Sequence, residues 1–189
     1  MDKPTPKNEA IKLDKHKYIM SRTDTKGNIE FGNDYFFEIS GYTANELMGK
    51  SHNIIRHPDM PKVIFKIMWE RLNQGKNMFA VVKNLAKDGR HYWVTTKFEI
   101  KRHPVDNAIV GYMAYRQAAK PAAVSEIEKL YEELLEIERN GGIEASEKYL
   151  IGYLDSKRMT YDEFIDEVIG NKGAFKLFFA TMAKLFGGK

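Results

Sequence analysis

The chain has 189 residues, no cysteine, and a net charge of +4 from 30 basic and 26 acidic side chains. Hydrophobic residues make up 43% and aromatic residues 12%, which is enough for a folded core and too much for a disordered protein. The lack of cysteine excludes disulfides and thiolate metal sites. No apolar run has the length of a membrane span, so we expect a soluble, cytoplasmic protein. Basic and acidic residues alternate without forming a basic stripe, and we therefore expect no nucleic-acid binding.

The first third of the chain predicts a flexible arm, a hairpin and short helices. Residues 1–15 are polar and contain two prolines, which is typical of a flexible N-terminal arm. Strands are expected at 18–23 and 28–31, around a turn that ends in Gly27. A short helix follows from Asn33 and stops at Gly41, and a capping-box pattern from Thr43 predicts another short helix.

The ten residues 52–61 hold two histidines, an arginine, an aspartate and two prolines. We call this segment the His–Pro loop. Each proline fixes its own φ and restricts the residue before it, so the sequence itself partly sets the shape of the loop. After Pro61, an apolar stripe with helical spacing predicts a helix that ends at Gly75. A segment built in this way is a candidate binding loop.

The middle of the chain changes to strand patterns. Residues 78–85, 91–100 and 109–115 are rich in β-branched and aromatic residues, and turn sequences separate them. Two strands, several helices and three further strands predict an α+β fold, with helices covering one face of a five-stranded antiparallel sheet. We place this domain at residues 16–120.

Residues 121–189 predict a C-terminal helical extension. Residues 118–123 are expected to form a linker, and capping boxes at Ser125 and Thr160 each begin an amphipathic helix. The first of these is expected to end at Gly141 and Gly142, with another helix at 145–155. A last helix is expected at 174–186, with a Phe-rich side and several lysines.

The sheet domain resembles a PAS sensor domain of the aerotaxis-receptor family. The resemblance is carried by Gly27-Asn28-Ile29, Ile39-Ser40-Gly41-Tyr42-Thr43, the whole His–Pro loop, Met68-Trp69, Val82-Lys83-Asn84, Lys87-Asp88-Gly89 and Tyr92-Trp93-Val94. Arg56-His57-Pro58-Asp59-Met60-Pro61, together with Lys83-Asn84 and Tyr92-Trp93, is the most specific part.

This resemblance implies FAD as the cofactor. The positions matching Arg56, His57 and Asp59 are needed for FAD binding in the family, and four further positions are expected near the flavin: Asn33, Trp69, Asn84 and Tyr92. The chain departs from the family at Met78, where the receptors usually carry a tryptophan that contacts the flavin.

The resemblance also implies the function. We expect a non-enzymatic redox sensor for energy taxis that signals through protein contacts to a membrane-bound, HAMP-containing chemotaxis transducer, at the inner face of the membrane. A homodimer is a further assembly that the sequence allows. The Phe-rich last helix is suited to an anionic membrane or to the transducer, and equally to packing within the protein.

The residues themselves leave other interpretations open. An ion pair between Arg56 and Asp59, with His57 beside it, would fix the His–Pro loop without binding anything. A haem-binding PAS domain would use His52 or His57 as the axial ligand. A PAS adaptor without any cofactor is the remaining alternative. The histidines are scattered and cysteine is lacking, so we expect no metal site. The sequence contains no recognisable pair of a nucleophile and a base, so we expect no catalysis.

Overall fold

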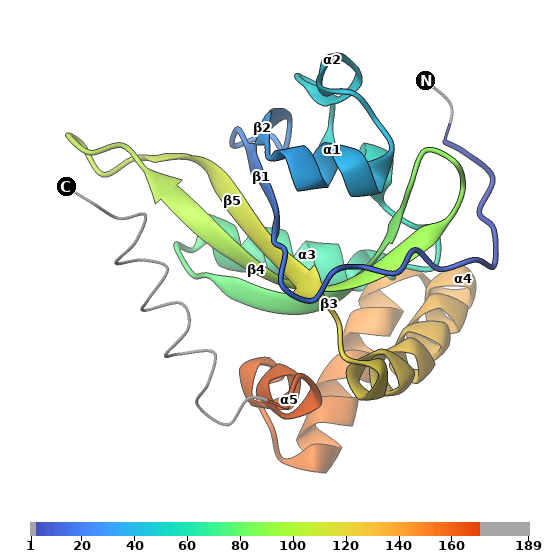
Figure 1. Ribbon diagram of the computed structural model, residues 1–189. Coiled ribbons are helices and arrows are strands. Elements are labelled where there is room, and N and C mark those ends of the chain that lie inside the picture. Colours follow the sequence, from blue (N-terminus) through green and yellow to red (C-terminus); the bar gives the residue numbers. More distant parts are fainter. Residues whose placement is uncertain (1–2, 171–189) are drawn as a thin grey trace.

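Five antiparallel strands form one sheet in the order β2-β1-β5-β4-β3 (Figure 1). The computed structural model describes residues 3–170. The strands are β1 (Ile19–Thr23), β2 (Ile29–Gly32), β3 (Met78–Leu85), β4 (His91–Arg102) and β5 (Ile109–Ala118). The helices are α1 (Asp34–Ser40), α2 (Ala44–Leu47), α3 (Lys62–Asn73), α4 (Pro121–Lys157) and α5 (Tyr161–Val168), with a 3₁₀ turn at His52–Ile55. The predicted α+β fold with a five-stranded antiparallel sheet is confirmed.

Local sequence signals explain the start of the domain. Gly27 closes the β1–β2 turn at φ 84°, a conformation that costs glycine little. The Asn33 side chain caps α1 by accepting a hydrogen bond from Phe36 N, and it also accepts one from Met20 N. Its amide donates to Tyr18 O. One side chain therefore ties the first helix to the first strand.

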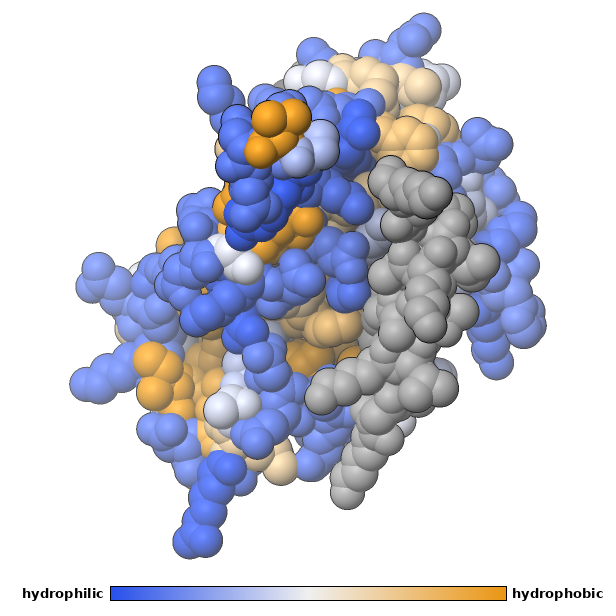
Figure 2. All heavy atoms as spheres, turned by 90° about the vertical axis from the view of Figure 1, so that its left-hand side faces the viewer, coloured by the Kyte–Doolittle hydropathy of each residue, from blue (hydrophilic) through white to orange (hydrophobic). Residues whose placement is uncertain are grey.

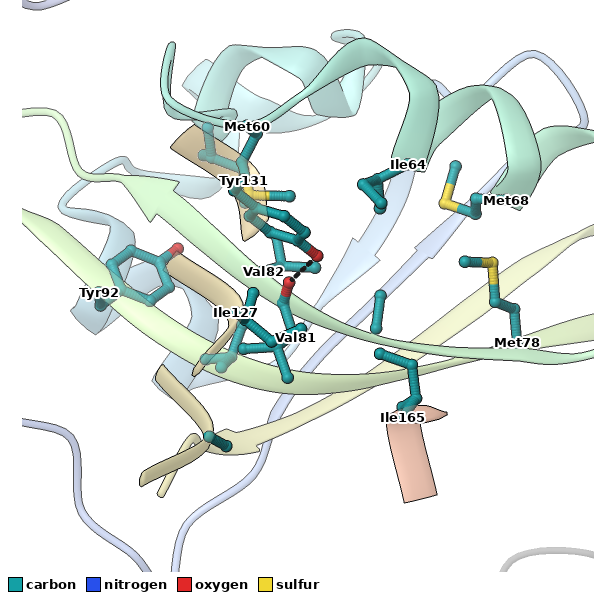
Figure 3. Close-up of a cluster of buried hydrophobic side chains, with 14 of the residues drawn as sticks. Met60, Ile64, Met68, Met78, Val81, Val82, Tyr92, Ile127, Tyr131 and Ile165 are labelled. Carbon is teal, nitrogen blue, oxygen red and sulfur yellow. Dashed lines mark hydrogen bonds between the residues drawn. The ribbon is translucent and has the colours of Figure 1, made fainter. Parts of the chain in front are cut away.

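The core lies between the sheet and α3. Alternate residues of β3 and β4 face this side, which we call the inner face of the sheet, and Val82 pairs there with Val94. Helix α3 presents Ile64, Met68 and Leu72 to it, all nearly inaccessible to solvent. Figure 3 shows α3 residues on one side of β3 and Ile165 of α5 on the other. Helix α3 of the sheet domain lies on one face of the sheet, and α4 and α5 of the helical extension also pack on β3, which is therefore covered on both sides (Figure 3).

The first half of helix α4 begins earlier than predicted and ends where predicted. Strand β5 continues to Ala118 and α4 begins at Pro121, so the predicted linker at 118–123 shrinks to two residues. Proline is well suited to the first turn of a helix, where its missing N–H has no partner to lose. At Gly142 the backbone leaves the helical region (φ 77°, ψ −177°), at the break that the two glycines predict. Tyr149 donates to Glu133 at 2.5 Å, so the two halves of α4 fold back on each other.

Polar contacts attach the helical extension to α3. Both Lys62 N and Val63 N, at the start of α3, donate to the carboxylate of Glu138 in α4, at 2.9 and 2.8 Å. Arg71 of α3 pairs with Asp162 of α5 at 2.6 Å. The extension is therefore joined to the sheet domain along β3 and α3.

The N-terminal residues, expected to be a flexible arm, lie extended along the β3–β4 hairpin. Lys7 N donates to Gly89 O, Ile11 N donates to His91 O, and His91 N donates to Glu9 O. Further back along the arm, Lys3 Nζ donates to the Arg56 carbonyl in the His–Pro loop. The arm thus reaches from the hairpin to the candidate binding loop.

On the face that Figure 2 shows, polar side chains predominate and hydrophobic ones lie in patches between them. Within residues 3–170 no helix is long and apolar enough to cross a membrane. The last predicted helix, at 174–186, lies outside the described residues.

Candidate functional site

A cavity of about 450 Å³ lies between the inner face of the sheet, α3 and the His–Pro loop. This volume falls in the usual range of small-molecule and cofactor sites. The lining residues come from β1, the following turn, the His–Pro loop and the residue before it, α3 and β3 to β5.

Apolar and aromatic side chains form most of the wall. Phe65, Met68, Trp69 and Leu72 line it from α3, and Val82 and Phe98 line it from the sheet. Trp69 stands edge-on to Tyr112 with 5.4 Å between ring centroids. A Cβ atom at Gly27 would lie 3.2 Å from the Trp69 ring, so glycine lets the turn approach the indole closely. These walls suit a flat, largely apolar ring system.

The other part of the wall is polar and rich in hydrogen-bond donors. Arg116 of β5 is 3% exposed, and its Nη1 donates to Ser21 Oγ at 2.9 Å. Its Nη2 donates to His52 Nε2 at 3.0 Å. Because a guanidinium can only donate, this ring nitrogen of His52 is the acceptor and carries no proton. Burial, reinforced by the positive charge of Arg116, lowers the pKa of His52 to about 3.

Arg116 is a buried cation that has no counter-ion within residues 3–170. Burial lowers its pKa to about 10, so it stays charged at neutral pH. Its hydrogen-bond partners in residues 3–170 are a hydroxyl and a neutral imidazole, and no carboxylate of this part of the chain forms an ion pair with it. A buried, unpaired charge is costly, and a ligand with negative charge or strong acceptors would offset that cost.

Polar atoms without a hydrogen-bond partner within residues 3–170 lie on the same side of the sheet as this cation. The Asn84 side chain lines the cavity, and its Nδ2 is buried without a hydrogen-bond acceptor among the described residues. Two hydroxyls of β4 are also buried without a hydrogen-bond partner among the described residues. They belong to Tyr92, which pairs with Asn84 across the strands, and to Thr96, which pairs with Arg116. Burial raises the pKa of Tyr92, so its hydroxyl keeps its proton. Such donors match a ligand edge that carries carbonyl oxygens and ring nitrogens.

The His–Pro loop closes the cavity along the edge of β3. Arg56 forms an isolated antiparallel bridge with Asn84, and the Met60 sulfur accepts from Lys83 N. The Arg56 guanidinium lines the cavity, donates to Met60 O at 2.7 Å and lies 4.2 Å from the centre of the Phe65 ring. Burial lowers the pKa of Arg56, although the negative charge of Glu138 acts against this.

Asp59 pairs with a residue of the sheet and not with Arg56. Lys83 Nζ donates to the Asp59 carboxylate at 2.8 Å, lies 3.7 Å from Glu128 of α4 and sits over the Trp93 ring. This corrects the interpretation in which Arg56 and Asp59 pair within the loop. Burial is the largest influence and acts to raise the pKa of Asp59, but the hydrogen bond and the positive charge of Lys83, with smaller effects from neighbouring histidines, together lower the pKa.

His57 is enclosed by the same group of charges. It is 3% exposed, accepts a hydrogen bond from Asp59 N at its Nδ1, and stands edge-on to His91. Burial lowers its pKa to about 4, with the negative charge of Asp59 acting in the opposite direction. The imidazole is therefore neutral at physiological pH.

The predicted site residues fall into three groups. Arg56, Trp69 and Asn84 line the cavity directly. His57, Asp59 and Tyr92 lie outside that lining, although the first two hold the shape of the loop and Tyr92 neighbours Asn84. Asn33 lies at the N-terminus of α1, where its side chain makes three hydrogen bonds to backbone groups. A direct cofactor contact for these last four residues stays a prediction.

Sequence reasoning missed Arg116 and the role of His52 beside it. One signal was available, because β5 alternates, and its inward-facing positions are Tyr112, Ala114 and Arg116. A charged residue at a strand position whose side chain faces the core indicates a buried functional group.

Met78, the departure from the family pattern, is 1% exposed and packs in the core near Met68 (Figure 3). No group of three or more His, Asp or Glu residues that could hold a metal occurs within residues 3–170.

Comparison with known proteins relates the sheet domain to a family and to a fold. Residues 29–115 match the PAS fold family. Over 116 residues, or 61% of the chain, the sequence is 41% identical to the aerotaxis receptor of Escherichia coli K12, and the match covers 22% of that receptor. It is 28% identical over 76 residues, or 40% of the chain, to the biofilm dispersion protein BdlA of Pseudomonas aeruginosa, of which it covers 18%. The chain therefore spans about a fifth of these relatives.

Solved structures share the fold. The light-state structure of the blue-light photoreceptor Aureochrome1 LOV aligns with a TM-score of 0.50 and 19% identity, over 63% of this chain and 91% of that one. A Light-Oxygen-Voltage domain from a study of a flavin analogue aligns with a TM-score of 0.50 and 20% identity, over 61% of this chain and 86% of that one.

Proposed function

Residues 29–115 form a PAS domain similar to part of a bacterial aerotaxis receptor, and from this premise we propose that the protein is a redox sensor that binds FAD. The observation that carries the proposal is a cavity with aromatic walls, lined by the buried Arg116, which has no carboxylate partner within residues 3–170, and by the Asn84 amide, which has no acceptor there. A flavin ring combines an apolar portion with an edge rich in acceptors, and the cavity offers a matching surface for each.

The residues present fit this group. Trp69 and Phe65 would contact the flat ring system, and Asn84 and Arg116 would donate to its polar edge. Lys26 and Arg56 are the remaining basic residues of the lining, and they would bind the phosphates. When bound, FAD supplies a reversible change of electron count and charge. Arg116 would make the cavity more favourable to negative charge, because it is buried and no described carboxylate pairs with it.

The geometry also supports a route to the helical extension. The His–Pro loop contacts Lys83 through Asp59, and Lys83 lies close to Glu128 of α4. Tyr131 of α4 donates to Val81 O on the edge of β3 at 2.8 Å. A shift of the loop would therefore change contacts made by α4, which is the physical requirement for coupling the cavity to an output surface.

We propose a role in signalling without catalysis. The partner would be a membrane-bound, HAMP-containing chemotaxis transducer, and the protein would act at the inner face of the cytoplasmic membrane through that contact. The relation to the aerotaxis receptor supports this role. Co-sedimentation with membranes that do and do not contain the transducer tests it. Equal sedimentation in both would contradict the partner assignment.

The absorption spectrum of the purified protein tests the cofactor. We expect the two bands of oxidised flavin, and FAD in the extract after denaturation. A haem Soret band would replace the proposal with a haem sensor, and a spectrum without either, even after incubation with excess FAD, would leave the cofactor-free adaptor. His52 meets a specific obstacle as the axial ligand of a haem, because its Nε2 already forms hydrogen bonds with Arg116 and Ser21.

A further inference from the structure

Three side chains from distant parts of the chain meet at the polar end of the cavity. Arg116 Nη1 donates to Ser21 Oγ at 2.9 Å, and Arg116 Nη2 donates to His52 Nε2 at 3.0 Å. The Ser21 hydroxyl itself lies 2.9 Å from the same nitrogen of His52. Each of the three therefore contacts the other two, and all three line the cavity.

Strand register explains how Ser21 and Arg116 come together. Ser21 of β1 pairs with Ala114 of β5, and Ile19, two residues earlier, pairs with Arg116. Ser21 and Arg116 are therefore diagonal neighbours on the inner face of the sheet, a separation that a long side chain spans easily. Ser21 is 1% exposed, so its hydroxyl is available only to groups inside the protein or in the cavity.

His52 is held by other elements besides Arg116. Its backbone N–H donates to Gly27 O at 2.9 Å. Its ring stacks on Phe36 of α1, with 5.8 Å between ring centroids and 15° between the planes. The β1–β2 turn and α1 therefore set the position of His52 Nε2, and the guanidinium meets an acceptor that is already in place.

Hydrogen-bond donors outnumber acceptors in this cluster. Nε2 of a neutral imidazole has one lone pair, whereas the Ser21 hydroxyl and Arg116 Nη2 both lie within 3.0 Å of it. A serine hydroxyl has one proton and two lone pairs, so Ser21 can accept from Nη1 and donate to His52 at the same time. His52 then keeps a donor when Nη2 turns to another acceptor. Arg116 Nη2 is the donor that the cluster has in surplus.

We propose that Ser21 is a positioning residue of the site, which anchors Arg116 Nη1 and donates to His52 so that Nη2 is free to bind an acceptor oxygen of a ligand in the cavity. The inference rests on the proposed function, in which this ligand is the polar edge of FAD. Ser21 acts through Arg116 and need not touch the ligand. Without the hydroxyl, Nη1 would lose its acceptor, and Nη2 would be the remaining donor to His52 Nε2 among the described residues.

The first measurement uses the full chain without ligand. Nitrogen-15 NMR follows the exchange of the Arg116 guanidinium protons with water, and Arg116→Met assigns their signals. We expect Ser21→Ala to raise the exchange rate about tenfold or more, because Nη1 loses its acceptor. Ser21→Thr keeps the hydroxyl and should retain the natural rate. Ser40→Ala is the matched control, since Ser40 is also fully buried but lies in α1, outside the cavity lining.

The second measurement titrates the same variants with oxidised and with reduced FAD. We expect Ser21→Ala to weaken the binding of reduced FAD about tenfold more than that of oxidised FAD, because the more negative form depends more on a well-placed guanidinium. This tenfold difference lowers the potential of the bound two-electron couple by about 30 mV. Ser21→Thr and Ser40→Ala should keep the natural potential.

An unchanged exchange rate in Ser21→Ala would overturn the proposal. A loss of stability in Ser21→Ala, with both FAD affinities and the potential unaltered, would also overturn it, because Ser21 would then serve only the fold. If the natural protein binds no FAD, the proposed function fails, and the exchange rates alone decide for or against Ser21 as the anchor of Arg116.

Discussion

Arg116 Nη2 lies 3.0 Å from His52 Nε2, and this contact fixes the protonation state of the imidazole. The guanidinium has no lone pair to offer, so His52 accepts and remains neutral. The two residues are 64 positions apart and meet at the polar end of the cavity. A neutral histidine and an unpaired arginine at that position give the site its surplus of positive charge.

The buried histidines make stability depend on pH. In the folded state the pKa values of His52 and His57 are about 3 and about 4, below the ordinary value of 6.5. As pH falls below 6.5, the unfolded chain binds protons that the folded chain does not, so stability is fully present above pH 6.5 and decreases toward pH 4. We expect His52→Gln to remove about 1.4 kcal/mol per pH unit from this slope. Urea unfolding between pH 7 and pH 5 measures it, and parallel curves for the two proteins would disprove the assignment.

Replacing the buried cation should separate ligand binding from folding. In Arg116→Met we expect the affinity for FAD to fall about tenfold or more, as for the loss of a hydrogen bond to a charged group. The free energy of unfolding without ligand should stay the same or rise, because an unpaired buried charge is removed. Flavin titration and urea unfolding measure the two quantities.

Arg22→Met is the matched control for this variant. Arg22 also lies on a strand but faces outward, where it pairs with Glu30 at 3.2 Å. The flavin affinity of the Arg22→Met variant should equal that of the natural protein. A large loss of stability in ligand-free Arg116→Met, without any effect on flavin affinity, would show that Arg116 is a structural residue.

The Asn84 amide is expected to contact the ligand rather than support the fold. Its Nδ2 has no acceptor within residues 3–170, so Asn84→Ala should cost little stability. Affinity for FAD should fall by about threefold to tenfold, corresponding to one neutral hydrogen bond. The response of the transducer to oxidation should weaken in protein that is saturated with FAD.

In the control variant Asn77→Ala, we expect the opposite effects on stability and on flavin affinity. Asn77 precedes β3, and its side-chain oxygen accepts from Ile100 N at 3.2 Å, away from the cavity lining. Its loss should reduce stability and leave flavin affinity unchanged. An unaltered redox response in FAD-loaded Asn84→Ala would exclude Asn84 from the signalling route.

Much of the sheet domain could be predicted because its signals are local. The turn glycine at position 27, the capping box at Thr43 and the alternation in β4 each determine structure within a few residues. Pro121 shows the limit of this reasoning, since the same residue type that suggested a linker is also favoured at the first turn of a helix.

The parts that could not be predicted depend on pairs of residues distant in the chain. The cap of α3 comes from Glu138, more than 70 residues downstream. Lys83, and not the nearby Arg56, pairs with Asp59, because the loop lies along β3. Such partners follow from the packing of elements, and neither periodicity nor composition contains that information.

Glu138 is the residue through which α4 holds the start of α3. Pro61, at the helix boundary, has no side chain that can cap, and the Glu138 carboxylate accepts from both Lys62 N and Val63 N. A carboxylate at a helix N-terminus also interacts favourably with the helix dipole. We expect Glu138→Ala to reduce the free energy of unfolding by about 1–2 kcal/mol. Glu138→Gln, which keeps one acceptor oxygen, should lose less.

The same variant should loosen the cavity, because the His–Pro loop leads directly into these two N–H groups. Amide hydrogen exchange at residues 52–63 should become faster in Glu138→Ala, while Glu144→Ala, an exposed residue beyond the bend of α4, should behave as the natural protein. Faster exchange confined to α4, with the loop unchanged, would show that Glu138 stabilises only its own helix. Faster exchange in the loop would instead establish a mechanical link between the cavity and the helical extension.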